Sequence, residues 1–353
     1  MKRFQIILLV MPLLYWAGCA DDENEDNPVI PGRKIYIVGS DEDGACYWVN
    51  GSRVELPGGD WATDIAVVDG DVYTTGTCGE YACYWINQEK YELPGVWGEG
   101  EAIAVDGNDV YVAGWFDNGS CYWKNGQKIN LTTNGESQAF AIGVRSNGSV
   151  YIGGSYINNH HYVIPCFWKD GNNRTNLPIP NHGDGEVYDI TFGEDGNMRY
   201  YAGFTMKPDN LTGYAPKAAR WRHTVRTDLP DGTSDISLYG TGSYGITIDG
   251  EDIYVAGYTD WIGDYYDDNT GGTFPRYWKN NTAHDLEGGP NTIFGTGQAN
   301  DIRVADGNVV VVGIATGGPT LGESACYWLN GELNYLEDVI GEQSSEAKGI
   351  FID

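Results

Sequence analysis

Short runs of apolar residues alternate with glycine-containing turns along most of this chain, and the runs recur in a fixed order. One such unit reads EAIAV from Glu101, DVYVAG from Asp109, CYWKNG from Cys121 and a short stretch around Ile129. Alternation of apolar and polar side chains over a few residues, bounded by turn residues, is typical of half-buried β-strands. Each unit therefore predicts four short strands.

The turns between these runs carry the residues that tight hairpins need. Between the first and second strands stand VDGD from Val68, IDGED from Ile248 and ADGN from Ala305, while Asn-Gly or a close relative separates the third strand from the fourth. Asp-Gly and Asn-Gly supply the positive φ angles of short hairpin turns. The units are therefore predicted to be antiparallel four-stranded sheets.

A tryptophan marks the third strand of every unit and follows an aromatic residue in all but AARWRHT from Ala218, as in GACYWVNG from Gly44 and SACYWLNG from Ser324. These seven tryptophans are 37 to 57 residues apart, at Trp48, Trp85, Trp123, Trp168, Trp221, Trp278 and Trp328. Periods of about 40 to 50 residues with several strands per repeat point to a β-propeller. The chain is predicted to be all-β, with a seven-bladed β-propeller of four-stranded antiparallel blades over residues 34–353.

The two ends of the repeat region complement each other. RKIYIVGS from Arg33 is a second strand that lacks a first, and the chain finishes with SSEAKGIFID, a first strand that lacks a successor. Residues 346–353 are therefore predicted to pair with residues 35–39. That pairing would close the ring and remove the exposed strand edges.

We interpret the repeated aromatic residues as packing rather than as a ligand cage. Alternation puts Cys46 and Trp48 on one face of their strand and Tyr47 on the other, so that both faces meet neighbouring blades. The cysteines that share the position of Cys46 are too far apart to bond with one another and are predicted to be small buried hydrophobes; they are Cys83, Cys121, Cys166 and Cys326. Cys78 lies outside this pattern and could bridge to Cys83 across a hairpin.

The repeat resembles the extracellular HAF-type repeats, in which an aromatic-Trp strand and a glycine turn lead to a leucine, a small-residue strand and a G-x-V-x-G strand. CYWINQEKYELPG from Cys83, EAIAVDGNDVYVAG from Glu101 and ACYWLNGELNYL from Ala325 carry this pattern. The resemblance covers residues 34–353. It implies an exported protein built of propeller-like repeats.

The N-terminal residues are predicted to be a targeting signal rather than part of the fold. Lys2 and Arg3 precede a short apolar run that ends in YWAGCA, and acidic residues follow at once. This resembles a bacterial lipoprotein signal over residues 1–18, with Cys19 lipidated as the membrane anchor; an ordinary cleaved secretory signal is the alternative. Residues 19–33 are predicted to be an acidic flexible tether. Ala20 and the acids after it also resemble the surface-export signal of Bacteroidetes lipoproteins, which implies a surface-exposed outer-membrane lipoprotein, or one facing the periplasm.

Charge narrows the range of partners. The chain has 50 acidic and 21 basic residues, a formal net charge of −29. Such a surface repels phosphate backbones and anionic lipid, so nucleic acid is excluded as an expected partner. Neutral ligands such as sugars, cations, or a protein remain, and the propeller itself is expected to be monomeric.

Function is expected where the repeats differ. The first-to-second and third-to-fourth turns lie on one face and are uniformly tight, whereas the loops on the other face vary, reaching SYINNHHYVIP from Ser155, FTMKPDNLTGYAPKA from Phe204 and YTDWIGDYYDDNTGGTFP from Tyr258. Long loops on a rigid scaffold commonly carry binding sites. Their aromatic side chains could stack on a glycan, with shorter loops adding Trp61, Trp97 and Phe116; the candidates are Tyr156, Tyr162, Tyr214, Trp261, Tyr265, Tyr266 and Trp115. The alternative is that these aromatics pack the loops onto the disc.

Signals for metal and catalysis are weaker. Asp264, Asp267 and Asp268 are close enough in sequence to hold a hard cation such as Ca²⁺, but they lack the ordered spacing of a calcium loop. Scattered loop carboxylates cannot establish the separation that a glycosidase needs, and no nucleophile elbow or phosphate-binding loop is present. The expected function is therefore a membrane-anchored binding module without a cofactor. A carbohydrate-active enzyme, or an accessory protein of polysaccharide use, is the alternative.

Overall fold

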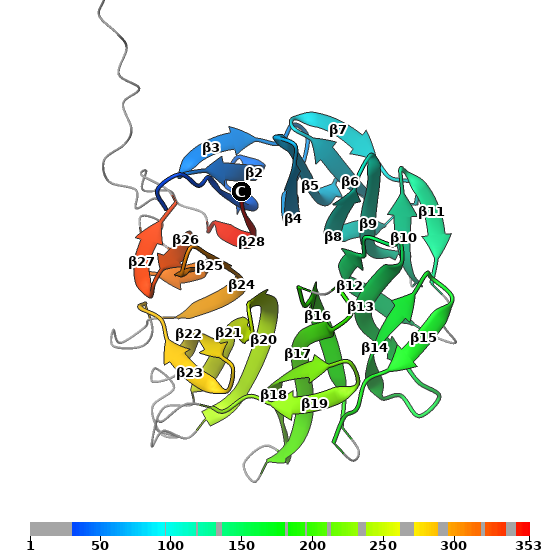
Figure 1. The fold of residues 1–353 in the computed structure, drawn as a ribbon, viewed down its shortest axis with the longest axis vertical. Helices are drawn as coiled ribbons and strands as arrows, with labels where there is room; N and C mark the ends of the chain where they lie inside the picture. The colour runs from blue at the N-terminus through cyan, green and yellow to red at the C-terminus, as the bar shows by residue number, and fades with distance from the viewer. Residues whose placement is uncertain are drawn as a thin grey trace, which may run out of the picture.

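Seven sheets surround a central axis like the blades of a propeller (Figure 1). The structure is a computed structural model that describes residues 30–95, 97–117, 119–131, 136–180, 183–194, 196–209, 213–231, 238–261, 272–288, 296–318, 322–336 and 344–353. Over these residues the chain forms 28 strands and no helix. All seven sheets are four-stranded and antiparallel, which confirms the predicted fold.

Each blade is named by its order along the chain. From the inner to the outer strand, blade 1 contains β28 (Glu346–Ile352), β1 (Ile35–Asp41), β2 (Gly44–Val49) and β3 (Ser52–Glu55); blade 2 β4 (Trp61–Val68), β5 (Asp71–Cys78), β6 (Tyr81–Ile86) and β7 (Glu89–Glu92); blade 3 β8 (Gly98–Asp106), β9 (Asp109–Phe116), β10 (Gly119–Lys124) and β11 (Gln127–Asn130); and blade 4 β12 (Ser137–Val144), β13 (Val150–Ile157), β14 (Val163–Lys169) and β15 (Asn173–Asn176). Blade 5 contains β16 (Gly185–Phe192), β17 (Arg199–Asp209), β18 (Gly213–Arg222) and β19 (Val225–Asp228); blade 6 β20 (Leu238–Asp249), β21 (Asp252–Trp261), β22 (Gly272–Lys279) and β23 (Thr282–Asp285); and blade 7 β24 (Gly297–Ala305), β25 (Asn308–Thr316), β26 (Glu323–Leu329) and β27 (Glu332–Tyr335).

The C-terminal strand closes the ring, as predicted. β28 pairs antiparallel with β1, with Ile35 opposite Ile352 and Ser40 opposite Glu346. Ala347 and Ile350 are fully buried in β28, between blade 7 and the rest of blade 1. Because the last strand completes the first blade, the two ends of the repeat region are held together by a full strand ladder.

The repeated tryptophans join consecutive blades. All seven are buried in the blade interfaces. In five of them the indole N–H donates to a backbone carbonyl just after the outer strand of the preceding blade, at 2.7–3.2 Å; the pairs are Trp85 to Pro57, Trp123 to Pro94, Trp221 to Pro178, Trp278 to Pro230 and Trp328 to Glu287. The packing interpretation of the aromatic-Trp pair is therefore confirmed.

The Asn or Asp after the aromatic-Trp strand has two structural roles. In six blades it adopts a φ angle of 49° to 58°, which the short turn needs. In each of these blades its side-chain oxygen also accepts the first backbone N–H of the second strand, at 2.8–3.1 Å; the residues are Asn50, Asn87, Asn125, Asp170, Asn280 and Asn330. The same side chain thus shapes one turn and caps a neighbouring strand.

The cysteines follow the repeat with one exception. Cys46, Cys121, Cys166 and Cys326 are buried and are not disulfide-bonded, as predicted. Cys83 instead forms a disulfide with Cys78, the pairing across a hairpin that the sequence allowed. This bond closes the hairpin turn between β5 and β6.

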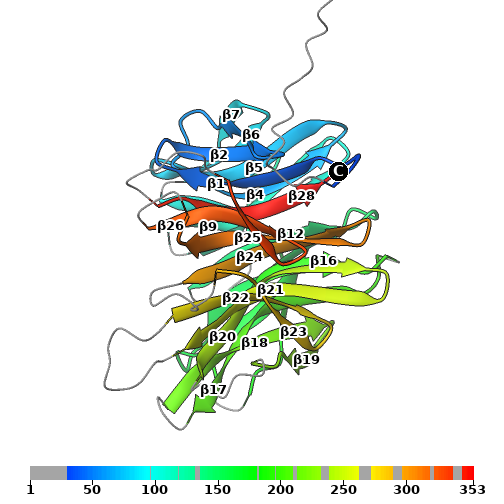
Figure 2. The same cartoon turned by 90° about the vertical axis from the view of Figure 1, so that its left-hand side faces the viewer.

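The disc has two unlike faces (Figure 2). We call the face where the inner strands begin, and where the second and third strands of each blade are joined, the long-loop face. The opposite face, where the inner strands end in short turns, is the tight-turn face; the C-terminus lies on it. Cys19 and most of the expected tether lie outside the described residues, but Ile30 is only 2% exposed and packs with the core between blades 7 and 1. Among the described residues no helix is long and apolar enough to cross a membrane.

Candidate functional site: an axial pocket on the long-loop face

A β-bulge interrupts the inner strand of every blade at the same level. At each bulge the register shifts against the second strand, which leaves extra residues unpaired. Bulges re-aim side chains, and here the unpaired residues all line one central cavity of about 780 Å³; they are Thr63, Glu101, Phe140, Tyr188, Tyr244 with Gly245, Asn300 and Lys348. We call this cavity the axial pocket. The bulges lie near the start of the inner strands, on the long-loop side, and the lining continues along these strands to Ala66, Ala104 and Phe351.

Aromatic rings form one side of the axial pocket. The ring of Tyr188 lies 5.0 Å from that of Phe140 and 5.1 Å from that of Tyr244, measured between centroids. Tyr244 in turn stacks on Tyr258, at 5.7 Å. Burial raises the pKa of the Tyr188 and Tyr244 hydroxyls, so both stay protonated as hydrogen-bond donors at neutral pH. We call Phe140, Tyr188 and Tyr244 the aromatic arc.

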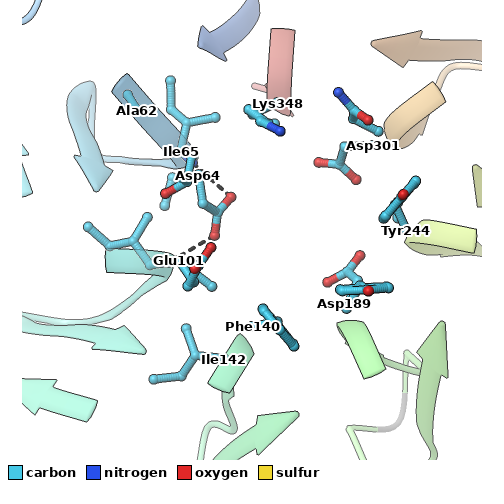
Figure 3. Close-up of a pocket in the computed structure, with 18 of the residues that line it drawn as sticks. Ala62, Asp64, Ile65, Glu101, Phe140, Ile142, Asp189, Tyr244, Asp301 and Lys348 are labelled. Atoms are coloured by element: carbon cyan, nitrogen blue, oxygen red, sulfur yellow. Dashed lines mark hydrogen bonds between the residues drawn. The ribbon is translucent and has the colours of Figure 1, made fainter. Parts of the chain in front are cut away.

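Polar and charged side chains occupy the other side. Figure 3 shows Glu101 across the pocket from Tyr244, with Lys348 beside Asp64 and Asp301. Lys348 pairs with Glu346 at 2.7 Å. Asn300 donates to the same Glu346 carboxylate and to the Ala347 carbonyl, and accepts from Gln298. The pocket therefore offers flat apolar surface on one side and hydrogen-bonding groups on the other.

Glu101 carries the most unusual electrostatics of the polar side. Burial, reinforced by the nearby Glu99 carboxylate, raises the pKa of Glu101 to about 7, although the indole N–H of Trp115 donates to it at 3.1 Å. The pKa of Glu99 is raised by burial too. A carboxyl with a pKa near neutrality can both donate and accept a proton at physiological pH.

Three aspartates beside the bulges join neighbouring inner strands. Each aspartate directly follows the unpaired residue of its bulge, and its carboxylate accepts the next backbone N–H of its own strand. The same carboxylate also accepts a backbone N–H from the following blade, at 2.7–3.1 Å. These bonds run from Ile103 to Asp64, from Ile246 to Asp189 and from Ile350 to Asp301. Figure 3 shows the two bonds of Asp64 as dashed lines. These carboxylates are structural clamps at the base of the pocket.

One cation lies among the three clamps. The Arg303 guanidinium donates to Asp301 at 2.7 Å, and its charge lowers the pKa of all three aspartates. Burial outweighs this effect: the pKa rises to about 7 for Asp64 and about 8 for Asp189, and it is raised for Asp301 as well. The base of the pocket is therefore a set of three acids with raised pKa values, arranged around the Arg303 guanidinium.

Three exposed aromatic residues extend from the pocket over the rim of blade 2. Trp61, which lines the axial pocket, is 51% exposed, and Trp97 is 63% exposed. Trp97 has a φ of 57°, an uncommon value for a bulky residue, and its backbone N–H donates to the Glu80 carbonyl beside the exposed Tyr81 at 2.7 Å. The Cys78–Cys83 disulfide closes the turn that carries Tyr81. We call Trp61, Tyr81 and Trp97 the rim aromatics.

The long-loop candidates from the sequence have mixed positions. Trp115 and Tyr156 line a second cavity of about 280 Å³, together with Glu186. Tyr156 is only 8% exposed, its ring lies 3.5 Å below the Arg174 guanidinium, and its hydroxyl accepts from Asn176, so its environment fits the packing alternative. Tyr162 is exposed on the loop between β13 and β14.

The remaining candidates cannot be placed in a site. The side chains of Tyr214 and Trp261, and all of Tyr265, Tyr266, Asp264, Asp267 and Asp268, lie outside the described residues. Over the part of the chain that is described, no group of three or more His, Cys, Asp or Glu side chains could hold a metal ion. The glycan and Ca²⁺ expectations for these loop residues stay predictions.

Sequence reasoning missed the aromatic arc. Phe140, Tyr188 and Tyr244 belong to inner strands β12, β16 and β20, and none of them is among the residues that the sequence predicts for a site. The signal that could have revealed them is the break in alternation, since each aromatic follows a buried residue such as Ala139 or Val187 and precedes another small or acidic residue.

Comparison with known proteins finds similarity among solved structures alone. No family model matches the chain, and no curated protein matches it. Among solved structures it is similar to the extracellular domain of a one-component system from B. thetaiotaomicron (10% identity, TM-score 0.44), the β-propeller domain of the Trilobed protease from Pyrococcus furiosus (10%, 0.48) and a polysaccharide lyase, an ulvan lyase (9%, 0.48). The matches cover 81%, 87% and 82% of this chain and 38%, 92% and 81% of those chains. The chain thus spans well under half the length of the B. thetaiotaomicron protein. Similarity at this level says nothing about activity, and the protein is defined by its own strand pairing as a seven-bladed β-propeller with an axial pocket.

Proposed function

We propose that this protein is an extracytoplasmic binding module that takes a glycan into the axial pocket of its long-loop face. The observation that carries the proposal is the division of one 780 Å³ cavity into an aromatic arc and a polar side. Pyranose rings have apolar C–H faces and a rim of hydroxyl groups, so they match a site with both kinds of surface. Pockets with a largely apolar wall and a few placed polar groups are the usual form of small-molecule sites.

Charge selects among glycans. The polar side holds the carboxyl groups of Glu99, Glu101 and Glu346 against the single ammonium of Lys348, and the whole chain carries a net charge of −29. An anionic polysaccharide would meet repulsion on approach. The expected ligand is therefore neutral or carries an amine.

The rim aromatics support a ligand longer than one sugar. Trp61 belongs both to the rim and to the wall of the axial pocket, and the loop that carries Trp97 is hydrogen-bonded to the turn beside Tyr81. A chain of sugars leaving the pocket over blade 2 would meet successive aromatic faces. We accordingly expect affinity to increase with the number of sugar units.

The proposal is tested with a glycan array and the purified propeller. Tyr244→Ala and Tyr188→Ala should each weaken binding to any hit by about two- to tenfold, in line with about 0.5 to 1.5 kcal/mol for a lost aromatic contact. Tyr162→Ala is the matched control, because Tyr162 is exposed on the same face but away from the axial pocket. Loss of binding in the control alone would move the site to the long loops. No binding across broad neutral and amine-bearing glycans would instead favour a protein partner.

Glu101 favours a second candidate, a carbohydrate-active enzyme. Its pKa of about 7 is suited to general acid catalysis on a bound glycan. Any glycan that binds should therefore be incubated with the wild type and with Glu101→Gln, and the products separated by chromatography. Products that disappear in Glu101→Gln support the enzyme. Tight binding by the wild type without products supports the module.

The cellular location belongs to the same proposal. The lipoprotein-like signal and the acidic segment after Cys19 support an anchored protein whose propeller stands off an outer membrane. Burial of Ile30 in the blade 7 to blade 1 core supports a tether that ends at the propeller. Exposure at the cell surface is favoured over the periplasm by the acidic residues that follow Ala20.

A further inference from the structure

One blade departs from the repeat in its third strand. In six blades the residue before the repeated tryptophan is aromatic, whereas blade 5 has AARWRHT, with Arg220 at that position. The aromatic residues of the other blades pack against the following blade; they are Tyr47, Tyr84, Tyr122, Phe167, Tyr277 and Tyr327. The apolar cluster between blades 5 and 6 contains no such ring from β18.

A groove of about 530 Å³ is found where the ring is missing. It is lined by Arg220 and Arg222 of β18, by Val225 and Thr227 of β19, by Met198, His223 and Ile253. Arg220 lies opposite Thr227 and Arg222 opposite Val225, so these four side chains share one face of the sheet. Strands β18 and β21 bring these residues to the tight-turn face, since Arg222 ends β18 and Ile253 is near the start of β21. We call this the guanidinium groove; it is on the opposite side of the disc from the axial pocket.

Blade 5 also lacks the carboxylate that neutralises the equivalent cation in blades 3 and 6. In blades 3 and 6 the lysine after the repeated tryptophan lies over a tyrosine of the second strand. The same lysine forms an ion pair at 2.7 Å with the aspartate two residues before that tyrosine. The pairs are Lys124 with Asp109 and Lys279 with Asp252. In blade 5, Arg222 lies over Tyr200 in the same register. The residue two positions before Tyr200 is Met198.

The two guanidinium groups therefore lack a carboxylate counter-charge among the described residues. Arg220 donates from one terminal nitrogen to the Asn281 side chain, a neutral amide, at 3.2 Å. Its Nε is buried without a hydrogen-bond partner in the described structure. Burial and the neighbouring Arg222 both lower the pKa of Arg220, which is the effect expected when cations are gathered without an anion. Two unneutralised arginines are unusual in a chain with a net charge of −29.

We propose that the guanidinium groove binds a small organic anion. In this ligand an oxyanion group, a carboxylate or a sulfate, is joined to an apolar body. Arginine donates in a planar fork that matches such groups. Val225, which is 67% exposed, together with Met198 and Ile253 supplies the apolar surface for the body of the ligand. The site does not depend on the axial pocket or on the function proposed for it.

The repeat itself supplies the variants that test this site. Arg220→Tyr restores the side chain found in most other blades and should fill the groove, abolishing anion binding while the urea midpoint stays at or above that of the wild type. Met198→Asp restores the missing carboxylate and should weaken binding by neutralising Arg222. Arg222→Gln should weaken it at least tenfold. Lys279→Gln is the matched control, because Lys279 occupies the same position in blade 6 but is already ion-paired.

The probe is 1-anilinonaphthalene-8-sulfonate, a fluorescent sulfonate on an apolar body, titrated into the folded protein at constant ionic strength. 4-Toluenesulfonate and 4-toluate should displace it, and the neutral 4-toluenesulfonamide should not. Retention of wild-type affinity in both Arg220→Tyr and Arg222→Gln would overturn the proposal, as would equal displacement by the sulfonamide. Loss of probe binding in Tyr244→Ala instead would assign it to the axial pocket and also count against the groove.

Discussion

The side chains at the base of the axial pocket show how individual residues connect the inner strands. Asp64, Asp189 and Asp301 each accept a backbone N–H from the following blade. The following blade in each case has a small residue at the equivalent position: Ala102, Gly245 or Gly349. At Gly245 a Cβ atom would lie 2.6 Å from the Asp301 carboxylate. The crowding at Gly245 comes from Asp301, the clamp of the next blade, so this position has room only for a small residue.

Arg303 should be the residue on which this arrangement depends. Arg303→Met removes the cation that lowers the pKa of all three aspartates, so their ionisation becomes costlier. Removal of one partner from a buried ion pair lowers the free energy of unfolding by about 3 to 5 kcal/mol. Because Arg303 is partly exposed, we expect Arg303→Met to lower it by about 2 kcal/mol at pH 8.5. At pH 5 the loss should be much smaller.

The sign of this pH dependence follows from linkage. The pKa values of Asp64 and Asp189 are raised in the folded protein, to about 7 and about 8. The folded state therefore binds more protons than the unfolded state between the ordinary aspartate pKa and these values, and the stability from these groups is lost as the pH rises through them. Urea unfolding at pH 5 and 8.5 measures the effect, with Lys124→Met, from an exposed ion pair, as control. An equal loss at both pH values would contradict the coupling.

At the scale of elements, β28 differs from every other inner strand because it reaches its blade from the far end of the chain. It is held by the ladder to β1, by the bond from Ile350 to Asp301 and by that from Asn300 to Ala347. Beyond the strand, the backbone N–H of Lys34 donates to the Asp353 side chain, and Arg33 donates to the Asp353 carbonyl. One seven-residue strand thus joins blade 7 to blade 1.

Loss of this strand should open the ring. Deletion of residues 346–353 is expected to leave blade 1 without its inner strand and to make it the first site of proteolysis. Ile350→Ala, at a fully buried position, should lower the free energy of unfolding by about 3 kcal/mol. Lys348→Ala, in the same strand but exposed to the pocket, should change it by less than about 0.5 kcal/mol. Denaturant unfolding and limited trypsin digestion would show this; a truncated chain as resistant as the full one would refute strand closure as a source of stability.

At the scale of the whole molecule, the propeller separates two environments. The long-loop face holds the axial pocket with its neutral and acidic groups, and the tight-turn face holds the guanidinium groove between blades 5 and 6. The whole chain carries a net charge of −29, and net charge keeps proteins soluble. The outer strand of each blade is only four residues long, which leaves little open edge for pairing with another chain.

The anchor is tested in the native host. Cys19→Ala should transfer the protein from the membrane fraction to the soluble one, because a lipid on Cys19 is the only anchor that the sequence indicates. Fractionation followed by immunoblotting measures the shift, and protease shaving of intact cells distinguishes the surface from the periplasm. A variant that stays with the membrane as firmly as the wild type would exclude lipidation at Cys19 as the anchor.

Much of the architecture was determined by the sequence itself. The aromatic-Trp strands, the Asn-Gly and Asp-Gly turns and the unmatched end strands predicted seven blades and their closure, and all three features recur in the strand pairing. The physical reason is that blade structure is local: strand alternation and turn conformation depend on residues a few positions apart. The buried cysteines followed from the same periodicity.

The tertiary structure alone decided where chemistry can occur. The aromatic arc draws Phe140, Tyr188 and Tyr244 from three blades, and only a bulge in each inner strand turns them toward the axis. Tyr156, for which the sequence left ligand stacking and loop packing open, is buried beneath Arg174. The pKa of Glu101 and the unneutralised Arg220 likewise depend on burial and on neighbours contributed by other strands or blades. Distances across the ring are set by closure, and no spacing along the chain encodes them.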